Sequence, residues 1–406
     1  MSTEQHDIVI VGAGLAGFHV ASRLAQQGYA GSVTLVGEEP WQPYDRPPLS
    51  KQYQVDGDEQ ALWLAPELPP TVTQLRQRKA VAINTLQQEL QLEDGSTLSW
   101  GRLVLATGSR PRQLAHLEHT ANVRTLRTLD DARAIRNALH SVSSLLVIGG
   151  GPIGLELAAS AAGLGVKSAV VELAPRLMGR SVPAAMADLI FQHHRSQGMA
   201  IHLGRTVAAL DETAAEAVLD DGQRAPAALV VVGIGVRAND ELAVQAGIAC
   251  DDGVFVDAWC RTTAPNVFAV GDVTRQRNPV TGRFERIETW SNAQGQAQAL
   301  AKILCQPAEA QPFDAVPWFW SDQGSARLQC AGAIQGEQQA WRTDAGGGRL
   351  LVHWTAGRVV GVAALNAPRD FVQLKRLIVP RPTITVEQLT APDANIRVLV
   401  QQALAA

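Results

Sequence analysis

Residues 8–17 read I-V-I-V-G-A-G-L-A-G, and residues 145–154 read L-L-V-I-G-G-G-P-I-G. Each stretch is an apolar, strand-like run that leads into the spacing G-x-G-x-x-G. The pattern that follows predicts a helix at 15–27 and a strand at 33–36 in the first copy, and a helix at 155–164 and a strand at 168–171 in the second. Such a duplication predicts two βαβ units, and hence an α/β protein with two Rossmann-type dinucleotide-binding domains.

An acidic residue closes each predicted unit. Glu38 lies 21 residues after Gly17, and Glu172 lies 18 residues after Gly154. In dinucleotide sites the three glycines allow a tight turn, a close approach of the pyrophosphate to a helix N-terminus and close helix–strand packing, while the acid accepts hydrogen bonds from ribose hydroxyls. A single glycine motif is often only a tight turn, but two complete copies predict two bound dinucleotides.

Composition sets the class of protein. The 406 residues suggest two to four domains, and 46% apolar with 18% charged residues is typical of a globular chain. A net charge of -4 gives no global attraction for nucleic acid or anionic lipid. The longest apolar stretches, such as 229–236, fall short of the roughly 18 residues of a membrane span, and the polar, slightly acidic start at 1–7 does not resemble a secretory signal. We therefore expect a cytoplasmic protein with no nucleic-acid and no membrane partner.

The cysteines and histidines suggest no metal site. Four cysteines are widely spaced without a C-x-x-C pair: Cys250, Cys260, Cys305 and Cys330. This pattern favours buried small side chains over a disulfide framework or a metal knuckle. His193 and His194 are adjacent on a predicted helix, so they cannot face one ion together, and Glu288 lies far away in the sequence.

The boundaries follow from strand and turn signals. Strands that end in small-residue turns at 102–109 and 266–273 punctuate the chain. We expect a first nucleotide domain at 1–112 and 238–317, an inserted second one at 113–237, and an α+β C-terminal domain at 318–406. In that last domain alternating runs predict an antiparallel sheet, with helical pieces after it; the strands are expected at 327–334, 338–342, 349–354 and 358–364, and the helices at 370–377 and 386–389.

Several longer motifs add a family resemblance. They are Pro43-Tyr-Asp-Arg-Pro-Pro-Leu-Ser-Lys51, Ala106-Thr-Gly108, Val147-Ile-Gly-Gly-Gly-Pro-Ile-Gly-Leu-Glu156, Phe268-Ala-Val-Gly-Asp272, Arg286-Ile-Glu-Thr-Trp-Ser-Asn-Ala293 and Pro317-Trp-Phe-Trp-Ser-Asp-Gln323. Over nearly its full length the chain resembles the flavin-dependent ferredoxin reductases of bacterial aromatic-ring dioxygenases, including biphenyl dioxygenase, and of cytochrome P450 systems, the putidaredoxin reductase-like family. The resemblance implies a glutathione-reductase-like fold: an FAD domain, an inserted NAD domain, and a C-terminal domain that covers one face of the flavin.

The resemblance also assigns the first site to FAD. The residues it implies there are Gly12, Gly14, Ala16, Gly17, Glu38, Arg46, Lys51, Val81, Ala106, Thr107, Gly108, Arg127, Asp272, Glu288, Thr289, Trp290 and Trp320. Among them Glu38 would bind the adenosine ribose and Asp272 the ribitol hydroxyls, while Arg46 and Lys51 would supply positive charge. The plainer alternatives are a solvated turn residue for Glu38 and a helix cap for Asp272.

The second site would hold NADH or NAD+. The implied residues are Gly149, Gly151, Pro152, Ile153, Gly154, Glu156, Glu172 and Gly235. The Glu172 carboxylate would bind the adenosine 2'- and 3'-hydroxyls and repel a 2'-phosphate, so we expect NADH to be preferred over NADPH. Arg176 and Arg180 lie close by in the sequence and could weaken that preference, although ordinary surface arginines are the plainer interpretation.

Three residues are implied in catalysis. Lys51 would place an ammonium beside the flavin, where it would stabilise the anionic reduced form, and Glu156 would pair with Lys51 and face the nicotinamide. Trp320 would lie against the flavin on the ferredoxin side and help electrons leave. Each has a plainer alternative: a solvated lysine, an acid at a helix N-terminus, and an aromatic residue in the core.

The expected activity is that of an NADH-dependent ferredoxin reductase, with a [2Fe-2S] ferredoxin as partner, of the Rieske type first. Disulfide reductases of this fold need a redox cysteine pair, and no cysteine precedes Cys250. The alternatives are a redox-sensing flavoprotein similar to apoptosis-inducing factor, or a reductase for a P450 ferredoxin or rubredoxin. Basic residues suggest a docking patch for an acidic ferredoxin, with ordinary solvated side chains as the alternative for each: Arg110, Arg283, Arg369, Lys375 and Arg376. The oligomeric state stays open.

Overall fold

The computed structural model describes residues 4–65, 68–117, 120–211, 213, 215–378, 384–391 and 394–405. The chain forms two compact units. The first unit comprises the residues up to 45, 59–110 and 237–317, and the second unit comprises 46–58, 111–236 and the residues from 318 onward. The chain passes from the first unit to the second within β7 (Ser109–Pro111) and returns within β16 (Val236–Ala238). The division into three domains stays a prediction.

The first unit is built on a seven-stranded sheet with the order β3-β2-β1-β6-β5-β4, in which β18 also pairs with β6. Its strands are β1 (Glu4–Val11), β2 (Val33–Val36), β3 (Val72–Leu75), β4 (Ala80–Asn84), β5 (Glu89–Leu92), β6 (Thr97–Leu105) and β18 (Val267–Ala269). The strands β3, β2, β1, β6 and β18 run parallel, whereas β4, β5 and β6 are antiparallel neighbours. Parallel pairing brings the carboxyl ends of β1, β6 and β18 to one edge, where ligands bind in such sheets.

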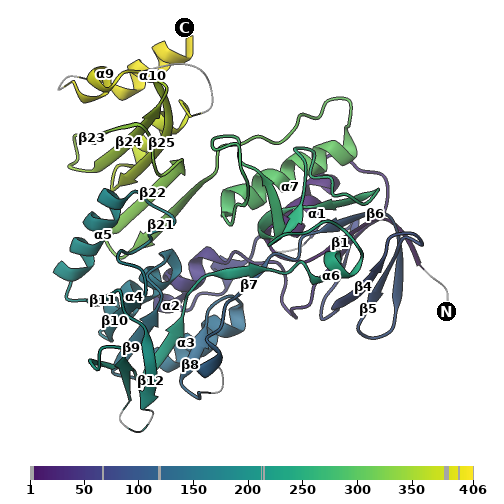
Figure 1. Ribbon diagram of the computed structural model, residues 1–406. Helices are drawn as coiled ribbons and strands as arrows, with labels where there is room; N and C mark the ends of the chain where they lie inside the picture. Colours follow the sequence, from purple (N-terminus) through teal and green to yellow (C-terminus); the bar gives the residue numbers. More distant parts are fainter. Residues whose placement is uncertain are drawn as a thin grey trace. The chain divides into compact units, whose positions relative to one another are not determined.

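Two helices cover one face of this sheet. These are α1 (Leu15–Gln26) and α7 (Trp290–Cys305), which lie side by side in Figure 1 and pack against each other. Because alternate side chains of a strand point to opposite faces, Ile8 and Ile10 of β1 join the core under these helices, while Val9 and Val11 join the core on the other face. Smaller elements complete the unit: η2 (Gln60–Leu62), α6 (Glu241–Gln245), η4 (Gly271–Val273), and a sheet of β17 (Val254–Phe255), β19 (Thr274–Arg277) and β20 (Phe284–Arg286).

The second unit contains a five-stranded parallel sheet with the order β11-β10-β9-β15-β8. Its strands are β8 (Val123–Thr125), β9 (Ser144–Ile148), β10 (Lys167–Glu172), β11 (Ala200–Leu203) and β15 (Leu229–Val232). The other elements here are η3 (Ala115–Leu117), α3 (Leu129–Leu139), α4 (Pro152–Gly163), α5 (Ala184–Ser196) and a small antiparallel sheet of β12 (Val207–Asp211), β13 (Glu216–Leu219) and β14 (Arg224–Pro226). Strands β9 and β15 are buried throughout and apolar except for Ser144, which is typical of strands covered on both faces.

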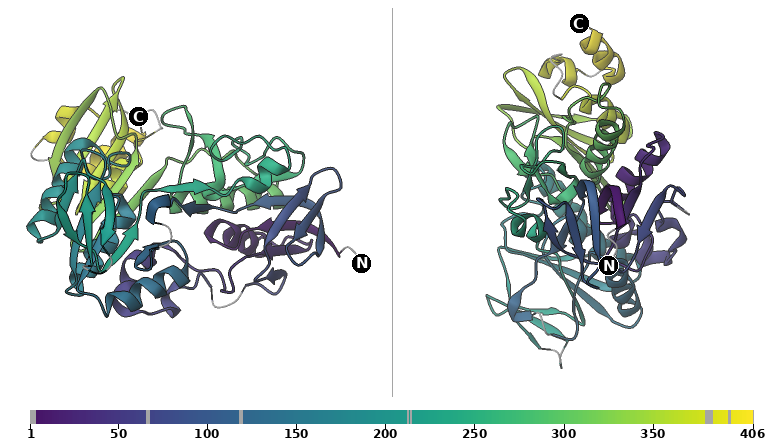
Figure 2. Two further views of the ribbon diagram at one scale, coloured as in Figure 1. Left: turned by 60° about the horizontal axis from the view of Figure 1, so that its bottom comes forward. Right: turned by 90° about the vertical axis from the view of Figure 1, so that its right-hand side faces the viewer.

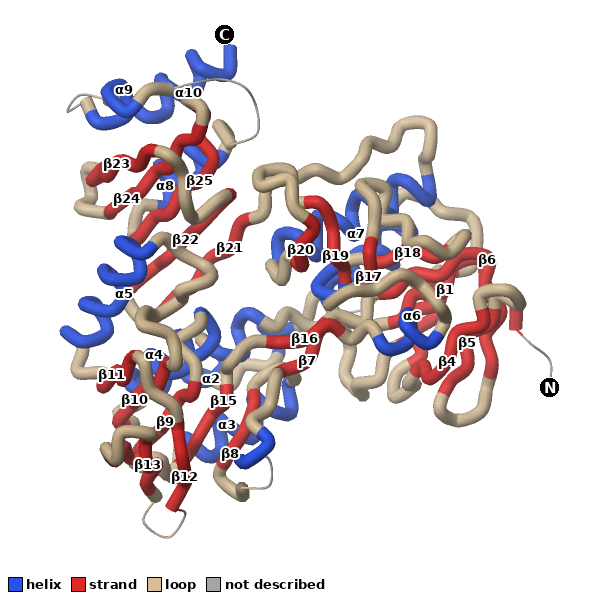
Figure 3. Tube along the Cα trace, viewed as in Figure 1, coloured by secondary structure: helices blue, strands red, loops and turns tan. Residues whose placement is uncertain are grey.

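The C-terminal part of the second unit is an antiparallel sheet with the order β21-β22-β25-β24-β23 (Figure 3). The strands are β21 (Trp318–Gln323), β22 (Ala326–Gly332), β23 (Gln338–Thr343), β24 (Arg349–Thr355) and β25 (Arg358–Leu365). Three helices follow, α8 (Pro368–Lys375), α9 (Val386–Thr390) and α10 (Ile396–Ala405). Helix α8 packs on β22 and β25, and the sheet and helices form one group in both views of Figure 2.

The segment 46–58 also belongs to the second unit. It forms η1 (Pro47–Ser50) and α2 (Gln52–Asp56), and both pack against α4. Pro47 and Pro48 open η1, where their fixed φ angles suit the first turn of a helix. The chain therefore leaves the first unit after Asp45 and carries Lys51 to the helix on which Glu156 lies.

The predicted α/β class and both βαβ units are confirmed, with shifts at element ends. Helix α4 begins at Pro152 and not at residue 155, because Gly151 is its N-cap and a proline suits the first position. The strand expected at 102–109 ends at Leu105, and the one expected at 266–273 ends at Ala269 and passes into η4. Strands β12 to β14 and helix α10 were not predicted, because short strands and a C-terminal helix carry weak patterns.

Candidate functional site

The first glycine motif forms a tight loop at the carboxyl edge of the sheet. Gly12 has φ +111°, and a Cβ atom there would overlap the carbonyl oxygen of Ala106. A Cβ atom on Gly17 would overlap the carbonyl oxygen of Gly12, whereas one on Gly14 would meet no atom within 4 Å. Close backbone contacts therefore leave no room for a side chain at the first and third glycines. The second glycine faces open space, which fits a loop that admits a pyrophosphate.

The second glycine motif repeats this geometry. Gly149 has φ +113°, and its Cβ atom would lie against the carbonyl oxygen of Gly233. A Cβ atom on Gly154 would be 2.5 Å from the oxygen of Gly149, whereas the nearest atom to one on Gly151 is 4.0 Å away. The two loops thus share one steric design in two different sheets.

Both loops lead into helices whose first turns lack a capping side chain. Gly14 is the N-cap of α1 and Gly151 is the N-cap of α4, and neither helix receives a side-chain cap from the described residues. The first N–H groups of a helix have no partner within it, and together with the helix dipole they attract an anion. These termini fit the pyrophosphates of two dinucleotides.

The two acids predicted to bind ribose differ in how firmly they are held. The Glu172 carboxylate accepts hydrogen bonds from the backbone N–H groups of Gly150 and Ala174, each at 2.7 Å. Glu38 is exposed and forms an ion pair with Lys79 at 3.0 Å. The carboxylate of Glu172 is therefore fixed beside the second glycine loop before any ribose arrives.

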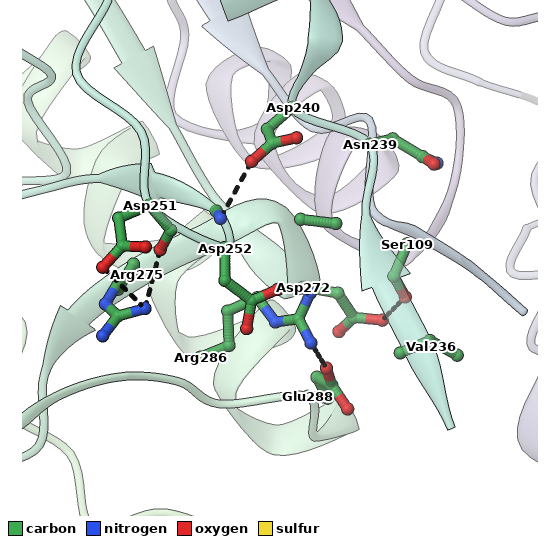
Figure 4. A network of polar contacts seen from close by, with 12 residues as sticks. Ser109, Val236, Asn239, Asp240, Asp251, Asp252, Asp272, Arg275, Arg286 and Glu288 are labelled. Carbon is green, nitrogen blue, oxygen red and sulfur yellow. Dashed lines mark hydrogen bonds and ion pairs between the residues drawn. The ribbon is translucent and has the colours of Figure 1, made fainter. Parts of the chain in front are cut away.

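Asp272 lies beside the first glycine loop. Its Oδ2 atom accepts a hydrogen bond from Ser109 Oγ at 3.0 Å, and the two side chains point toward each other in Figure 4. The neighbouring Gly271 has φ +80°, and a Cβ atom there would be 3.0 Å from that of Ala16. This contact places Asp272 next to the start of α1, and its role toward ribitol hydroxyls stays a prediction.

A second carboxylate region follows in the same unit. Figure 4 shows the Arg286 guanidinium between Asp252 and Glu288, at 3.2 Å and 2.5 Å. Thr289 is the N-cap of α7, and the Trp290 indole donates to Asp45 at 2.8 Å. The ion pairs and the indole bond fix the backbone that leads into α7.

The loop 106–108 is tied to residues that return after the second unit. Thr107 Oγ1 donates to the carbonyl oxygen of Asn239 at 2.7 Å, and the Asn239 amide donates back to the carbonyl oxygen of Thr107 at 2.9 Å. Ala106 N–H donates to the oxygen of Val11 at 2.8 Å, which holds the loop against the end of β1. Gly108 has φ +69°, which explains the glycine at this turn.

The remaining residues predicted for the flavin site are more dispersed. Val81 lies on the edge strand β4 of the first unit. Arg46, Lys51, Arg127 and Trp320 belong to the second unit, so their roles toward the flavin stay predictions. In the second site Pro152 opens α4, Ile153 follows it with its side chain 47% exposed, and a Cβ atom on Gly235 would be 3.1 Å from the Arg180 guanidinium.

A buried ionic cluster lies within the second unit. The Lys51 Nζ atom is 3.2 Å from Glu156 Oε1, the pairing that the resemblance implies. The carboxylate also accepts hydrogen bonds from Ser50 Oγ at 2.5 Å and Ser321 Oγ at 2.7 Å. The side chains of Lys51 and Glu156 are only 15% and 5% exposed. Three segments that are far apart in sequence therefore converge on one carboxylate.

The burial of Glu156 and the polar partners of its carboxylate shift its pKa in opposite directions. Burial raises the pKa of Glu156 above its ordinary value, while the Lys51 charge and the hydroxyls of Ser50 and Ser321 lower it. Lys51 Nζ also lies 5.6 Å from the ring centroid of Trp320, within cation–π range. The cluster thus presents a fixed cation, an acid held by two hydroxyls, and an indole.

The sequence analysis did not single out Ser50 or Ser321. They lie 106 and 165 residues from Glu156, so no local spacing could place them together. Both lie inside the quoted motifs at 43–51 and 317–323, and that was the available signal.

Trp318 and Trp320 of β21 face the same way, as expected from their alternation with Phe319. The rings of Trp318 and Trp320 have centroids 5.8 Å apart. Lys375 lies over the Trp318 ring at 4.1 Å, and burial lowers the pKa of Lys375. Of the other predicted docking residues, Arg369 and Arg376 are exposed beside it in sequence.

Two of the predicted docking residues, Arg110 and Arg283, belong to the first unit. Arg110 forms an ion pair with Glu241, which neutralises its charge locally. Arg283 is exposed.

The cysteines are free thiols, and three of them have raised pKa values because of burial. Burial raises the pKa of Cys250 to about 11 and of Cys260 to about 12, and it also raises the pKa of Cys330. These three thiols are therefore protonated near neutral pH and unsuited to thiolate chemistry.

Two kinds of feature are missing from the described ranges. Within them no group of three or more His, Cys, Asp or Glu residues is arranged to hold a metal ion. Within the same ranges no helix combines the length and the apolar character that a membrane crossing needs.

Known proteins match both parts of the chain. A family model for pyridine nucleotide-disulphide oxidoreductases matches residues 6–297, and one described as reductase C-terminal matches 318–400. The ferredoxin–NAD(+) reductase component of the p-cumate 2,3-dioxygenase system of Pseudomonas putida is 38% identical, over 98% of this chain and 99% of that protein.

Two solved structures share the fold at 34% identity. The reductase in a covalent putidaredoxin reductase–putidaredoxin complex has a TM-score of 0.92, with 99% of each chain covered. The ferredoxin reductase for the CYP199A2 system of Rhodopseudomonas palustris has a TM-score of 0.91, with 97% of this chain and 100% of that one covered.

Proposed function

Because the chain belongs to the pyridine nucleotide-disulphide oxidoreductase family, we propose that it is an oxidoreductase that passes electrons from NADH through FAD to a [2Fe-2S] ferredoxin. The ferredoxin is of the Rieske type and serves an aromatic-ring dioxygenase. NADH is a cytoplasmic electron donor, so we place the enzyme in the cytoplasm.

The observation that carries the proposal is the buried pair of Lys51 and Glu156 in a chain without a reactive thiolate among its buried cysteines. Enzymes of this family that reduce disulphides need a low-pKa cysteine next to the flavin. In this chain no cysteine precedes Cys250, and the buried pair of Lys51 and Glu156 cannot form a disulphide. In this proposal the electrons therefore leave the enzyme by transfer to a separate carrier protein.

The residues divide the work between binding and electrostatics. The two glycine loops and the N-termini of α1 and α4 bind the pyrophosphates, and Glu172 binds the ribose hydroxyls of the nicotinamide dinucleotide. NADH supplies a hydride, and FAD converts this two-electron donation into single electrons. With FAD and NADH bound, Lys51 would supply positive charge that stabilises a reduced flavin, and Glu156, which holds the Lys51 ammonium, would face the nicotinamide.

The acceptor follows from the relatives. One relative is named for a dioxygenase system, and one solved structure is named for a CYP system, so a P450-type ferredoxin is the second candidate. The C-terminal region from Trp318 has nine Lys and Arg against six Asp and Glu, and this local basic excess suits an acidic protein partner.

The test is anaerobic reduction of purified ferredoxins by the flavin-loaded enzyme and NADH, followed at the iron–sulfur absorbance. A Rieske-type and a P450-type ferredoxin are compared side by side. Faster reduction of the Rieske-type protein supports the proposal, and faster reduction of the other transfers the assignment to a P450 system. If NADH reduces the flavin but neither ferredoxin is reduced, the proposal of a ferredoxin reductase is wrong.

A further inference from the structure

A line of buried hydrogen bonds continues from the ionic cluster away from Lys51. Ser321 Oγ, which donates to Glu156, accepts a hydrogen bond from Gln323 Nε2 at 3.0 Å. Gln323 Oε1 is 2.7 Å from His194 Nε2 on α5. Ser321, Gln323 and His194 are all buried. Strand β21 thus links α4 to α5 through side chains alone.

The chemistry of each group fixes the direction of these bonds. The Gln323 carbonyl oxygen can only accept, so His194 donates through Nε2–H. Burial lowers the pKa of His194, with its neighbour His193 acting in the same direction and the Gln323 bond in the opposite one, so the ring is neutral with its proton on Nε2. His194 therefore turns the carbonyl end of the amide toward α5.

The amide end of Gln323 must then face Ser321. It also lies 3.5 Å from Met178 Sδ, an acceptor without a proton to give, which requires the same orientation of the amide. With an N–H pointing at its oxygen, the Ser321 hydroxyl keeps its single proton for Glu156. If the amide were reversed, Ser321 would donate to Gln323, and the carboxylate would lose a hydrogen bond.

We propose that Gln323 is a positioning residue that, held by His194, orients the Ser321 hydroxyl toward Glu156 and thereby fixes the carboxylate beside Lys51. It does not touch the cofactors and acts only through Ser321. The inference deepens the proposed function, because Glu156 is the acid assigned there to the nicotinamide side. Lys51 is the charged group that the described structure places against Glu156, and His193 lies next to His194.

The first test is a double-mutant cycle of Gln323→Met and Ser321→Ala. Methionine keeps the length of glutamine and removes its hydrogen bonds to Ser321 and His194. Loss of a hydrogen bond to a buried carboxylate favours its protonated form, so the acidic limb of the pH profile for flavin reduction by NADH should move up by about one pH unit in Ser321→Ala. In Gln323→Met the Ser321 hydroxyl stays but is no longer oriented, so the limb should move in the same direction by a smaller amount. The double variant should show the shift of Ser321→Ala and no more, because Gln323 acts on Glu156 only through Ser321.

A second readout needs no turnover. Because the folded-state pKa of Glu156 lies above its unfolded value, the stability it contributes is present at low pH and lost as pH rises through that pKa. A further rise of the Glu156 pKa in Gln323→Met should therefore lower the thermal midpoint more at pH 8 than at pH 5. A loss of packing alone would lower both equally. An equal loss, an unmoved acidic limb, or shifts that add in the double variant would each overturn the proposal.

The histidine gives an independent arm if Gln323→Met does not fold. His194→Leu removes the donor, whereas His194→Gln keeps an N–H donor at the position of Nε2 and should reverse at least half of the shift. His193→Leu, next to it on the same helix, is the matched control and should leave the profile unmoved. A His194→Leu profile equal to that of the wild type would refute the proposal. A wild-type flavin that NADH does not reduce would refute the proposed function instead, and the stability readout would still decide the role of Gln323.

Discussion

Lys51→Met tests the ionic cluster most directly, because it leaves the Glu156 carboxylate buried without its cation. Breaking one partner of a buried ion pair costs about 3–5 kcal/mol if the other charge remains. Glu156 limits that cost by taking up a proton. From its ordinary pKa of 4.5, protonation at pH 7 costs about 3 kcal/mol, at 1.36 kcal/mol per pH unit. At pH 5 the same limit is below about 1 kcal/mol.

The sign follows from the raised pKa of Glu156. A carboxyl whose folded pKa is above its unfolded value stabilises the fold at low pH, and this contribution disappears as pH rises through the folded pKa. In a unit of 150–250 residues, 1 kcal/mol shifts the melting midpoint by ~2–4 °C. The midpoint of Lys51→Met should therefore lie ~6–12 °C below that of the wild type at pH 7 and less than ~3 °C below it at pH 5.

The assay is thermal unfolding of the flavin-loaded enzyme from pH 5 to pH 8, with stopped-flow flavin reduction by NADH on the same samples. The control is Lys51→Met combined with Glu156→Gln, which removes both charges and should recover most of the stability but not the rate. A deficit that is the same at every pH, or a double variant as unstable as the single one, would refute the reasoning about burial. An unchanged rate of flavin reduction in Lys51→Met would remove the lysine from the mechanism.

Three further results are expected. Glu172→Ala should lower kcat/KM for NADH at least about tenfold while changing that for NADPH much less, because it removes the carboxylate proposed to accept from the ribose hydroxyls, which Gly150 and Ala174 hold in place. A wild-type enzyme equally efficient with both nucleotides would contradict the role of this acid. Trp320→Ala should reduce ferredoxin turnover more than ferricyanide turnover, and equal losses would favour core packing. Replacing Arg369 and Arg376 with Gln should raise KM for ferredoxin and flatten its salt dependence; a wild-type KM that salt does not change would exclude the docking patch.

Local patterns were enough to predict the parts of the fold that depend on short sequence separation. The glycine motifs at 12–17 and 149–154 specify strand, turn and helix within one stretch, and the structure shows the steric contacts behind each glycine. The antiparallel C-terminal sheet was predicted from short strand-like runs separated by turn signals, although its strands β22 and β24 are buried at consecutive positions. Short strands such as β14 carry too few residues for a period to be visible.

The candidate site was less accessible to such patterns. Glu156 and Lys51 were named from the family resemblance, and nothing in their own neighbourhoods shows that they meet. The hydroxyls and the amide around Glu156 come from segments more than 100 residues away, so only the folded chain brings them together. His194 illustrates this limit. From the sequence it was considered only as a metal ligand, and its hydrogen bond to Gln323 is visible only in the folded chain.

The placement of 46–58 in the second unit matters to anyone who recombines this enzyme with a relative. An exchange of residues 111–236 alone would take α4 from one parent and the Ser50–Lys51 loop from the other, which would separate a carboxylate from the hydroxyl and ammonium that evolved with it. Crossover points just after Asp45 and Asp58 would move the loop together with its helix. A functional chimera therefore requires a discontinuous graft, which also includes β21, because Ser321 completes the set.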